Sequence, residues 1–340
     1  MGNASNARVT NGIRGALKEL GLLRGFVPID AFDEDVDYPG ALAEIGVMVG
    51  PYPLVRLMRH GFHKRRYLIV APNSTWVPSS LVEIVESHAE AVGPSRWAAV
   101  ILECYLEQPW VSVWRHGVDQ GFKPDPEAHE LLEREYKKGV FRVLHLSSSA
   151  LQRKGTWELL RGWKKFLLRT ELEPRLAIGL DHSSPDMEEY AEEHLRGTVN
   201  WLGHVGGDVA KMAELYQSFH VVCQPSRGEG FGMVPLEARA CGIPICATSC
   251  TGHAEHVGLK LFAPEMGVSI IEHGRMDDID DGPGARAPAV ASSEIRRALD
   301  RFELAWNDFH CRALGKAEAV RQDWSWRAVT EKWLKEERIQ

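Results

Sequence analysis

The sequence has few cysteines, no long apolar run and no excess of positive charge. Its 6 cysteines include no C-x-x-C pair, and a chain of 340 residues does not need disulfides to hold its core. No run approaches the ~18–20 apolar residues that span a bilayer, and the first residues lack the apolar segment of a signal peptide. We therefore expect a cytoplasmic protein with reduced thiols, neither secreted nor transmembrane.

The net charge of −7 at pH 7 provides no overall attraction for nucleic acid or anionic lipid. A local basic cluster lies at residues 56–66, although such runs are more often solvated helix faces or loops. Its members are Arg56, Arg59, His60, His63, Lys64, Arg65 and Arg66. Nucleic acid therefore stays open as a partner but is not favoured.

The composition is that of a globular protein with more than one core. With 44% apolar and 26% charged residues, the chain can bury enough surface to offset the entropy of ordering it. Its length exceeds a typical domain of ~100–200 residues. Short apolar runs alternate with helical spacing, which is typical of parallel β/α units. Strands are predicted at 45–49, 67–71, 141–146, 175–180, 198–202, 219–223 and 243–247, and helices near 8–20, 79–87 and 95–106.

A break rich in glycine and proline separates two such series of units. This break lies at the end of the segment 111–126, V-S-V-W-R-H-G-V-D-Q-G-F-K-P-D-P, and it predicts a domain boundary there. The acidic stretch at 276–290 is also rich in glycine and proline and predicts a surface loop. The predicted units are a small Rossmann-like domain at 1–126, a second Rossmann-like, doubly wound domain at 127–322, and a C-terminal helix at 323–340.

The strongest functional signal is the segment 224–244, Q-P-S-R-G-E-G-F-G-M-V-P-L-E-A-R-A-C-G-I-P. It follows a predicted strand and leads into a helix that we expect to begin at Pro235, since proline suits the first helical turn. Helix N-termini offer unpaired N–H groups and partial positive charge, which suit a diphosphate. The amides concerned are those of Gly230, Phe231, Gly232 and Met233. The flanking carboxylates of Glu229 and Glu237 suit the hydroxyls of a sugar or a ribose.

In these residues the chain resembles the retaining GT-B glycosyltransferases of family 4. The resemblance rests on E-G-F-G-M-V-P-L-E, with two glutamates separated by seven residues, and extends through A-R-A-C-G-I-P to Glu255. Weaker matches are H-G-V-D at 116–119, R-K-G at 153–155 and D-W-S-W at 323–326. The resemblance implies an α/β protein of the GT-B fold. Two Rossmann-like domains would face a cleft, and the C-terminal helix would be able to cross back to the first domain.

The resemblance also implies the roles of the site residues. Glu237 would bind the ribose hydroxyls of the donor, and Glu229 would face the transferred sugar. Lys154 with Arg153 would neutralise the departing diphosphate, because negative charge builds on the leaving oxygen. The donor would be a UDP- or GDP-linked sugar, with no metal and no other cofactor. The anomeric configuration would be retained by attack on the same face, although a carboxylate nucleophile is not excluded.

Three features depart from the family pattern. Ser149 stands where the family usually has an arginine five positions before the lysine, so either Arg153 substitutes for it or donor affinity is low. Asn73, in A-P-N-S-T, stands where the family often has a histidine that contacts the donor, and it is our candidate replacement. The family's first strand is not found ahead of the loop that contains Gly2 and Asn3. That loop contacts the acceptor or a phosphate, or only connects to the helix that follows.

Several histidines have simpler explanations than catalysis. His116 is expected to stabilise the linker after the first domain. His253 and His256 lie close to Cys250 in sequence, but these three residues fall short of the four ligands of a structural zinc site. We therefore expect no metal site there.

The predicted activity is the transfer of a hexose-like unit from a nucleotide sugar to an unidentified acceptor hydroxyl. One alternative is glycosylation of modified bases in DNA, in which the basic cluster would bind phosphates and binding would weaken steeply with salt. Two others are an epimerase, which needs no acceptor, and a catalytically silent nucleotide-sugar-binding protein, which releases no nucleoside diphosphate.

Overall fold

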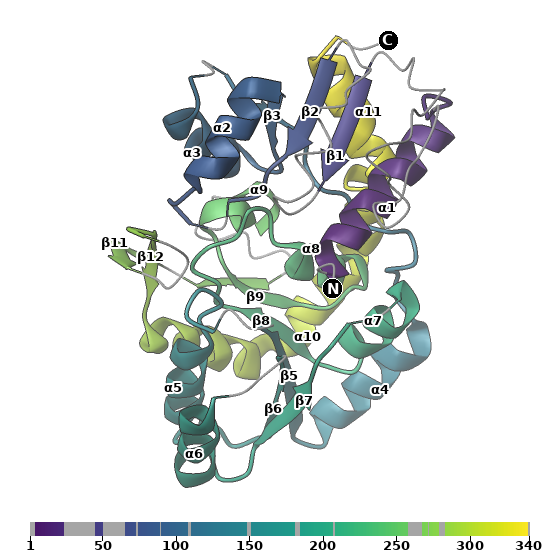
Figure 1. The fold of residues 1–340 in the computed structure, drawn as a ribbon. Helices are drawn as coiled ribbons and strands as arrows, with labels where there is room; N and C mark the ends of the chain where they lie inside the picture. Colours follow the sequence, from purple (N-terminus) through teal and green to yellow (C-terminus); the bar gives the residue numbers. More distant parts are fainter. Residues whose placement is uncertain are drawn as a thin grey trace.

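The computed structural model describes residues 4–23, 45–49, 65–72, 74–88, 90–107, 110–147, 151–180, 184–206, 208–257, 267–270, 272–278 and 283–338. The predictions for Gly2, Asn3, Asn73 and Ser149 lie outside these ranges. So does the basic cluster, except for the backbone of its last two residues. Figure 1 shows two sheets, one above the other, with helices beside each.

The first sheet is parallel, and its described strands lie in sequence order. They are β1 (Ile45–Val49), β2 (Arg65–Ile69), β3 (Glu90–Gly93) and β4 (Ser112–Val113). Its helices are α1 (Ala4–Glu19), α2 (Ser79–His88) and α3 (Arg96–Tyr105). The predicted helices and the strand at 45–49 are confirmed, and the strand expected at 67–71 begins two residues earlier. β3 was not predicted, because a strand of 4 residues is too short for a periodic signal.

The second sheet has the strand order of a Rossmann fold. Its parallel strands lie in the order β10-β9-β8-β5-β6-β7, which is 3-2-1-4-5-6 when counted from β5 and read from the other edge. Their bounds are β5 (Val140–Leu146), β6 (Glu173–Gly179), β7 (Val199–Gly203), β8 (Val221–Gln224), β9 (Ile245–Thr248) and β10 (Gly267–Ile270). The direction of winding reverses between β5 and β8, so the turns that follow these two strands leave the sheet side by side.

Helices alternate with the strands of this sheet, as the sequence predicted. They are α4 (Pro126–Lys137), α5 (Thr156–Leu167), α6 (Pro185–His194), α7 (Val209–Tyr216), α8 (Met233–Ala240), the short η3 (Thr251–His253) with α9 (Ala254–Val257), and α10 (Ser292–Asp323). α5 buries Leu159, Trp163 and Phe166, whose spacing places them on one helix face against β5. α8 begins at Met233, so Pro235 lies within the first helical turn rather than at its start.

The expectation of a surface loop at 276–290 is wrong. Both ends of this stretch belong to an antiparallel pair, β11 (Glu272–Asp278) and β12 (Arg286–Val290). Ala287, Ala289 and Val290 of β12 are buried, and Pro288 accepts a hydrogen bond from Arg227 through its carbonyl oxygen. Glycine and proline gather between the two strands, so composition averaged over the whole stretch concealed the paired ends.

The C-terminal helix crosses back to the first sheet. α11 (Trp326–Glu336) follows α10 and packs against α1, as Figure 1 shows on the right of the molecule. The Trp333 ring stacks on Trp114 at 3.9 Å and meets the Tyr67 ring edge-on at 5.0 Å. The expected crossing is thus confirmed. It joins the half of the molecule that contains the first sheet to the half that contains the second sheet. Among the described residues, no helix is long and apolar enough to cross a membrane.

The contact between α1 and α11 generates a stability prediction. A Cβ atom at Gly12 would lie 2.1 Å from the Trp326 ring, whereas one at Gly15, one turn along α1, would meet no atom within 4 Å. Gly12→Ala should therefore destabilise the protein by about 1–3 kcal/mol through overpacking. Gly15→Ala, the matched control, should stabilise it by about 0.5–1 kcal/mol because glycine disfavours helices. Urea unfolding measures both, and equal effects at the two positions would contradict the packing of these helices.

Candidate active site

Two turns at the carboxyl edge of the second sheet form the candidate site. One follows β5 and leads to α5, and the other follows β8 and leads to α8. The Arg227 amide of the second turn donates to the Arg153 carbonyl of the first at 2.7 Å, which joins them. Ligands of open α/β sheets bind at this edge, where the winding reverses. Figure 1 shows that this edge faces the first sheet.

Three residues expected from the sequence meet in one ionic group. Lys154 Nζ lies 2.5 Å from Glu229 Oε1, and Arg153 Nη1 lies 3.5 Å from the same oxygen. Arg153 also donates to the Gly228 carbonyl at 2.6 Å. Burial alone would raise the pKa of Glu229, but the charges of Lys154 and Arg153 outweigh it and hold that pKa well below its usual range. Glu229 is therefore ionised at neutral pH, between two cations.

The start of α8 lies beside this group and has no side-chain cap. Gly232, the residue before the helix, has φ +86°, and a Cβ there would lie 2.0 Å from the His253 ring, so only glycine fits. Within the described part of the chain, the N–H groups of Phe231, Gly232 and Met233 have no hydrogen-bond acceptor. Gly232 and Met233 are partly exposed, whereas Gly230 and Phe231 are buried. An anion would therefore approach the first turn of α8 rather than the buried part of the loop.

The buried part of the loop packs against the first sheet's half of the molecule. Ser95 Oγ, at the start of α3, donates to the Gly230 carbonyl at 2.7 Å. A Cβ atom at Gly230 would come within 2.8 Å of Ala71 Cβ. The Phe231 ring lies 5.1 Å from the His116 ring. The turn thus lies between the two halves of the molecule, as the sequence predicted. Its first part, at Gly230 and Phe231, is covered by protein.

A carboxylate from α9 also links the two halves. Glu255 accepts from the Arg96 amide at 2.5 Å and from Arg115 Nε at 2.7 Å. Arg96 begins α3 and Arg115 follows β4, so both donors come from the first half. This contact holds α9, and through it the turn before α8, against α3.

The environment of Glu237 was not predicted. Its side chain is fully buried, with Arg8 Nη1 of α1 2.7 Å from Oε1 and the Tyr216 hydroxyl of α7 2.6 Å from Oε2. We expected this carboxylate to be available to ribose hydroxyls. An arginine on an amphipathic helix far away in sequence carries no signal for such a contact. Only the tertiary arrangement, in which the N-terminal end of α1 lies near α8 in Figure 1, brings Arg8 there.

Three buried histidines surround the turn. His253 Nδ1 lies 3.3 Å from Thr248 Oγ1, and His256 Nε2 lies 3.1 Å from the Phe231 carbonyl oxygen. Burial lowers the pKa of His253 to about 4 and that of His116 to about 3. All three rings are therefore neutral at pH 7, since burial also lowers the pKa of His256. Across the described ranges, no three His, Cys, Asp or Glu residues are grouped so that they could hold a metal ion.

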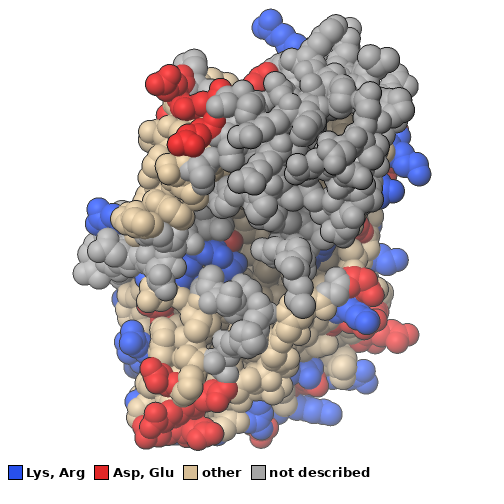
Figure 2. Space-filling model, viewed as in Figure 1, with Lys and Arg blue, Asp and Glu red and all other residues tan. Residues whose placement is uncertain are grey.

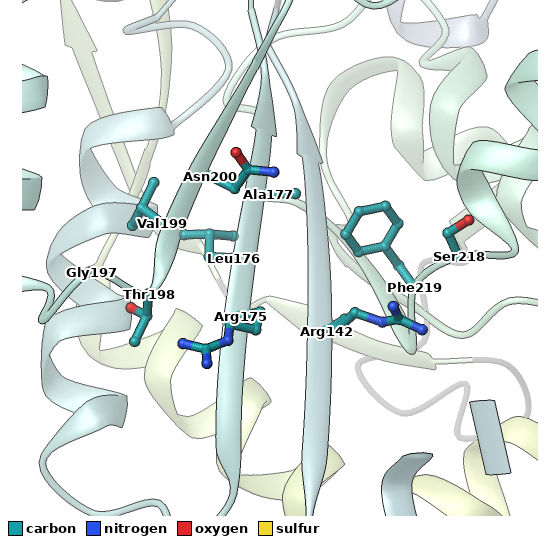
Figure 3. A pocket seen from close by; sticks show the side chains of 10 residues that line it. All are labelled: Arg142, Arg175, Leu176, Ala177, Gly197, Thr198, Val199, Asn200, Ser218 and Phe219. Carbon is teal, nitrogen blue, oxygen red and sulfur yellow. The ribbon is translucent and has the colours of Figure 1, made fainter. Parts of the chain in front are cut away.

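A cavity lies at the opposite end of the second sheet. It has a volume of about 530 Å³ and opens at the amino ends of the strands. Figure 3 shows Arg142 and Arg175 projecting from two neighbouring strands, with Thr198, Ser218 and Phe219 around them. None of the predicted site residues lines this cavity, and it lies at the edge that open α/β sheets do not use for ligands. We assign it no role.

Charges of both signs are spread over the visible surface. Figure 2 shows acidic and basic atoms mixed over the lower part of this face, with basic atoms also at mid-height, where the lower part meets the upper part. The described residues on this face thus present no broad patch of one sign.

Comparison with known proteins agrees with this geometry. Residues 141–273, which contain both turns and α8, match the model of the family "Glycosyl transferases group 1". An uncharacterized glycosyltransferase of Methanocaldococcus jannaschii is 39% identical over 107 residues, 30% of this chain and 26% of its own. This segment is therefore similar to group 1 glycosyl transferase domains. The family is one of transferase enzymes. The chain spans only about a quarter of the length of the curated relatives it matches.

The fold is shown by solved structures. A glycosyltransferase from Rickettsia africae superposes with a TM-score of 0.66 at 16% identity, over 98% of this chain and 94% of that one. HepE of Anabaena, solved in complex with UDP-glucose, superposes with a TM-score of 0.65 at 14% identity, over 88% of this chain and 79% of its own. The expected GT-B fold is thus confirmed, and the segment that matches the group 1 model contains the second Rossmann-like sheet.

The buried histidines generate a pH prediction. The His116 pKa of about 3 lies below the ordinary value of 6.5, so the unfolded chain takes up a proton as the pH falls and the folded protein does not. Stability should therefore fall as the pH drops below 6.5. For this one ring the loss between pH 7 and pH 5 is about 2 kcal/mol.

Replacing the ring tests this assignment. His116→Leu should remove that share of the loss between pH 7 and pH 5, as measured by urea unfolding at both values. His116→Asn should remove it as well, although its buried amide lowers stability at both pH values. A pH dependence identical to that of the original protein in both variants would show that His116 is not held neutral.

Proposed function

We propose that this protein transfers a sugar from a nucleoside diphosphate sugar to an acceptor hydroxyl, with retention of the anomeric configuration and without a metal. The observation that supports this most is the ionic group of Lys154, Arg153 and Glu229 beside the uncapped start of α8. Cations and free amides together suit a diphosphate, and a carboxylate beside them suits sugar hydroxyls. All of these groups lie where the winding of a Rossmann sheet reverses.

The reaction breaks the bond between the anomeric carbon and the diphosphate oxygen, and it forms a bond from the acceptor oxygen to the same carbon. The acceptor hydroxyl loses its proton to the departing diphosphate, and both events occur on one face of the sugar. Negative charge grows on the leaving oxygen, which Lys154, Arg153 and the amides of Gly232 and Met233 would stabilise. If Glu229 exchanged its contacts with the two cations for contacts with the sugar hydroxyls, Lys154 and Arg153 would become available to the diphosphate.

We propose a UDP- or GDP-linked hexose as the donor. The solved HepE structure that shares this fold contains UDP-glucose, and a curated relative, LpsB of Rhizobium meliloti, is named a lipopolysaccharide core biosynthesis mannosyltransferase. Glu237, at the start of α8's second turn, is our candidate for the ribose hydroxyls. The acceptor would enter from the side of the first sheet, which faces the turn.

Removing the site charges tests the proposed activity. Lys154→Ala should lower kcat by at least about 100-fold, because the leaving diphosphate loses a cation. Glu237→Ala should also strongly reduce turnover by weakening the hold on the donor. The measurement is release of nucleoside diphosphate from UDP-glucose and GDP-mannose with a panel of hydroxyl acceptors, after thermal-shift screening has identified the donor base. Turnover should persist in EDTA, and product NMR should show the donor's anomeric configuration.

Lys211→Ala is the matched control, since Lys211 is an exposed lysine of α7. It should behave like the original protein. Unchanged turnover in both site variants would remove the assignment. A change of sugar configuration without an acceptor would indicate an epimerase, and binding without release of diphosphate would indicate a silent binding protein.

A further inference from the structure

Arg8 connects α1 of the first half to the candidate ribose carboxylate of the second half. Its Nη1 atom lies 2.7 Å from Glu237 Oε1, and Tyr216 donates its hydroxyl proton to Oε2 at 2.6 Å. Glu237 is fully buried, whereas the Arg8 side chain is 23% exposed. One carboxylate therefore has a charged donor from one half of the molecule and a neutral donor from the other.

The position of Arg8 is held by the packing of α1. Val9 and Ile13 are buried in a cluster with Trp326 and Trp333 of α11, and Gly12 lets the Trp326 ring approach the helix backbone. Arg8 lies one residue before Val9 and five before Ile13, so its backbone is held by the anchored part of α1. The ion pair thus forms only when α1 is seated over α8.

We propose that Arg8 is a positioning residue for the donor, which holds Glu237 in the orientation that recognises the ribose hydroxyls, so that the ribose site is completed across the two halves. This rests on the proposed function, in which Glu237 contacts the ribose.

The number of acceptor sites on Glu237 agrees with this role. An ionised carboxylate has about four lone-pair sites on its two oxygens. Arg8 uses one on Oε1 and Tyr216 uses one on Oε2, which leaves one on each oxygen. Two neighbouring hydroxyls of a ribose need one acceptor each. Arg8 and Tyr216 hold the two oxygens from different elements, α1 and α7.

Arg8 also supplies positive charge that the second half lacks at this point. Lys154 and Arg153 are both paired with Glu229, and within the described residues no other Lys or Arg forms an ion pair with Glu237. Each of the two glutamates of the E-G-F-G-M-V-P-L-E segment therefore has its own cationic partner. The partner of Glu229 comes from its own sheet, and the partner of Glu237 comes from the other half.

Discrimination between ribose and deoxyribose tests the proposal. The probes are UDP and GDP, each compared with its 2′-deoxy and 3′-deoxy forms, with affinities measured by calorimetry. The original protein should bind the ribose form more tightly. Arg8→Gln should weaken binding of the ribose form by about 10- to 100-fold, the range expected when a charged hydrogen-bond partner is lost. The ratio of the affinities for the ribose and deoxyribose forms should then be close to one. Arg8→Lys should restore part of the ratio.

Kinetic measurements on the donor separate positioning from chemistry. Arg8→Gln should raise KM for the nucleotide sugar much more than it lowers kcat. The matched control is Arg14→Gln, an exposed arginine on α1, which should keep both the KM and the ratio. Tyr216→Phe, which keeps Arg8, should also reduce the ratio by removing the second support of Glu237.

Two further outcomes distinguish recognition from folding. If Arg8→Gln is unstable because Glu237 loses its counter-charge, the double variant Arg8→Gln with Glu237→Gln should regain stability without regaining the ratio. A folded Arg8→Gln protein that keeps the full preference for ribose overturns the proposal and leaves the transferase function intact. Failure of the original protein to bind any nucleoside diphosphate would instead contradict the proposed function itself.

Discussion

Two buried carboxylates must be paired with cations, and this requirement determines how the residues between the two sheets are arranged. A buried charge is costly unless it is paired, so Glu229 and Glu237 require cations close by. Lys154 and Arg153 come to Glu229 from the neighbouring turn, and Arg8 comes to Glu237 from α1. The first pairing needs only the second sheet, because β5 and β8 are neighbours there. The second pairing needs both halves, and it makes the position of α1 part of the site.

The rest of the interface serves the same arrangement. α11 returns from the second half and packs on α1 through Trp326 and Trp333, while Ser95 and Glu255 fasten the turn before α8 to the first half. The Ser95 and Glu255 contacts hold the turn before α8 against the first half, and the tryptophan contacts hold α1 against α11. A nucleotide sugar at the start of α8 would therefore bind between parts of the chain that already meet in its absence.

The predictions from sequence succeeded where neighbouring residues decide the structure. Alternating apolar runs predicted the strands, the helix predicted at 323–340 is present as α11, and the glycines with their flanking glutamates marked the turn before α8. Composition averaged over a stretch gave the wrong prediction at 276–290, because a hairpin places its turn residues between two paired strands. β3 was missed because four residues are too few for a period.

The sequence by itself predicted two α/β units, since alternating apolar runs are a local property, and its resemblance to a family predicted that Lys154, Arg153 and Glu229 act together. Tertiary structure alone decided that Glu237 is held by Arg8 and Tyr216 and that part of the glycine turn is covered by Ser95 and its neighbours. The physical reason is that these contacts join segments whose separation along the chain carries no periodicity. The Arg8 contact also needs α1 to be held in place by α11, and packing of that kind leaves no mark on any single stretch of residues.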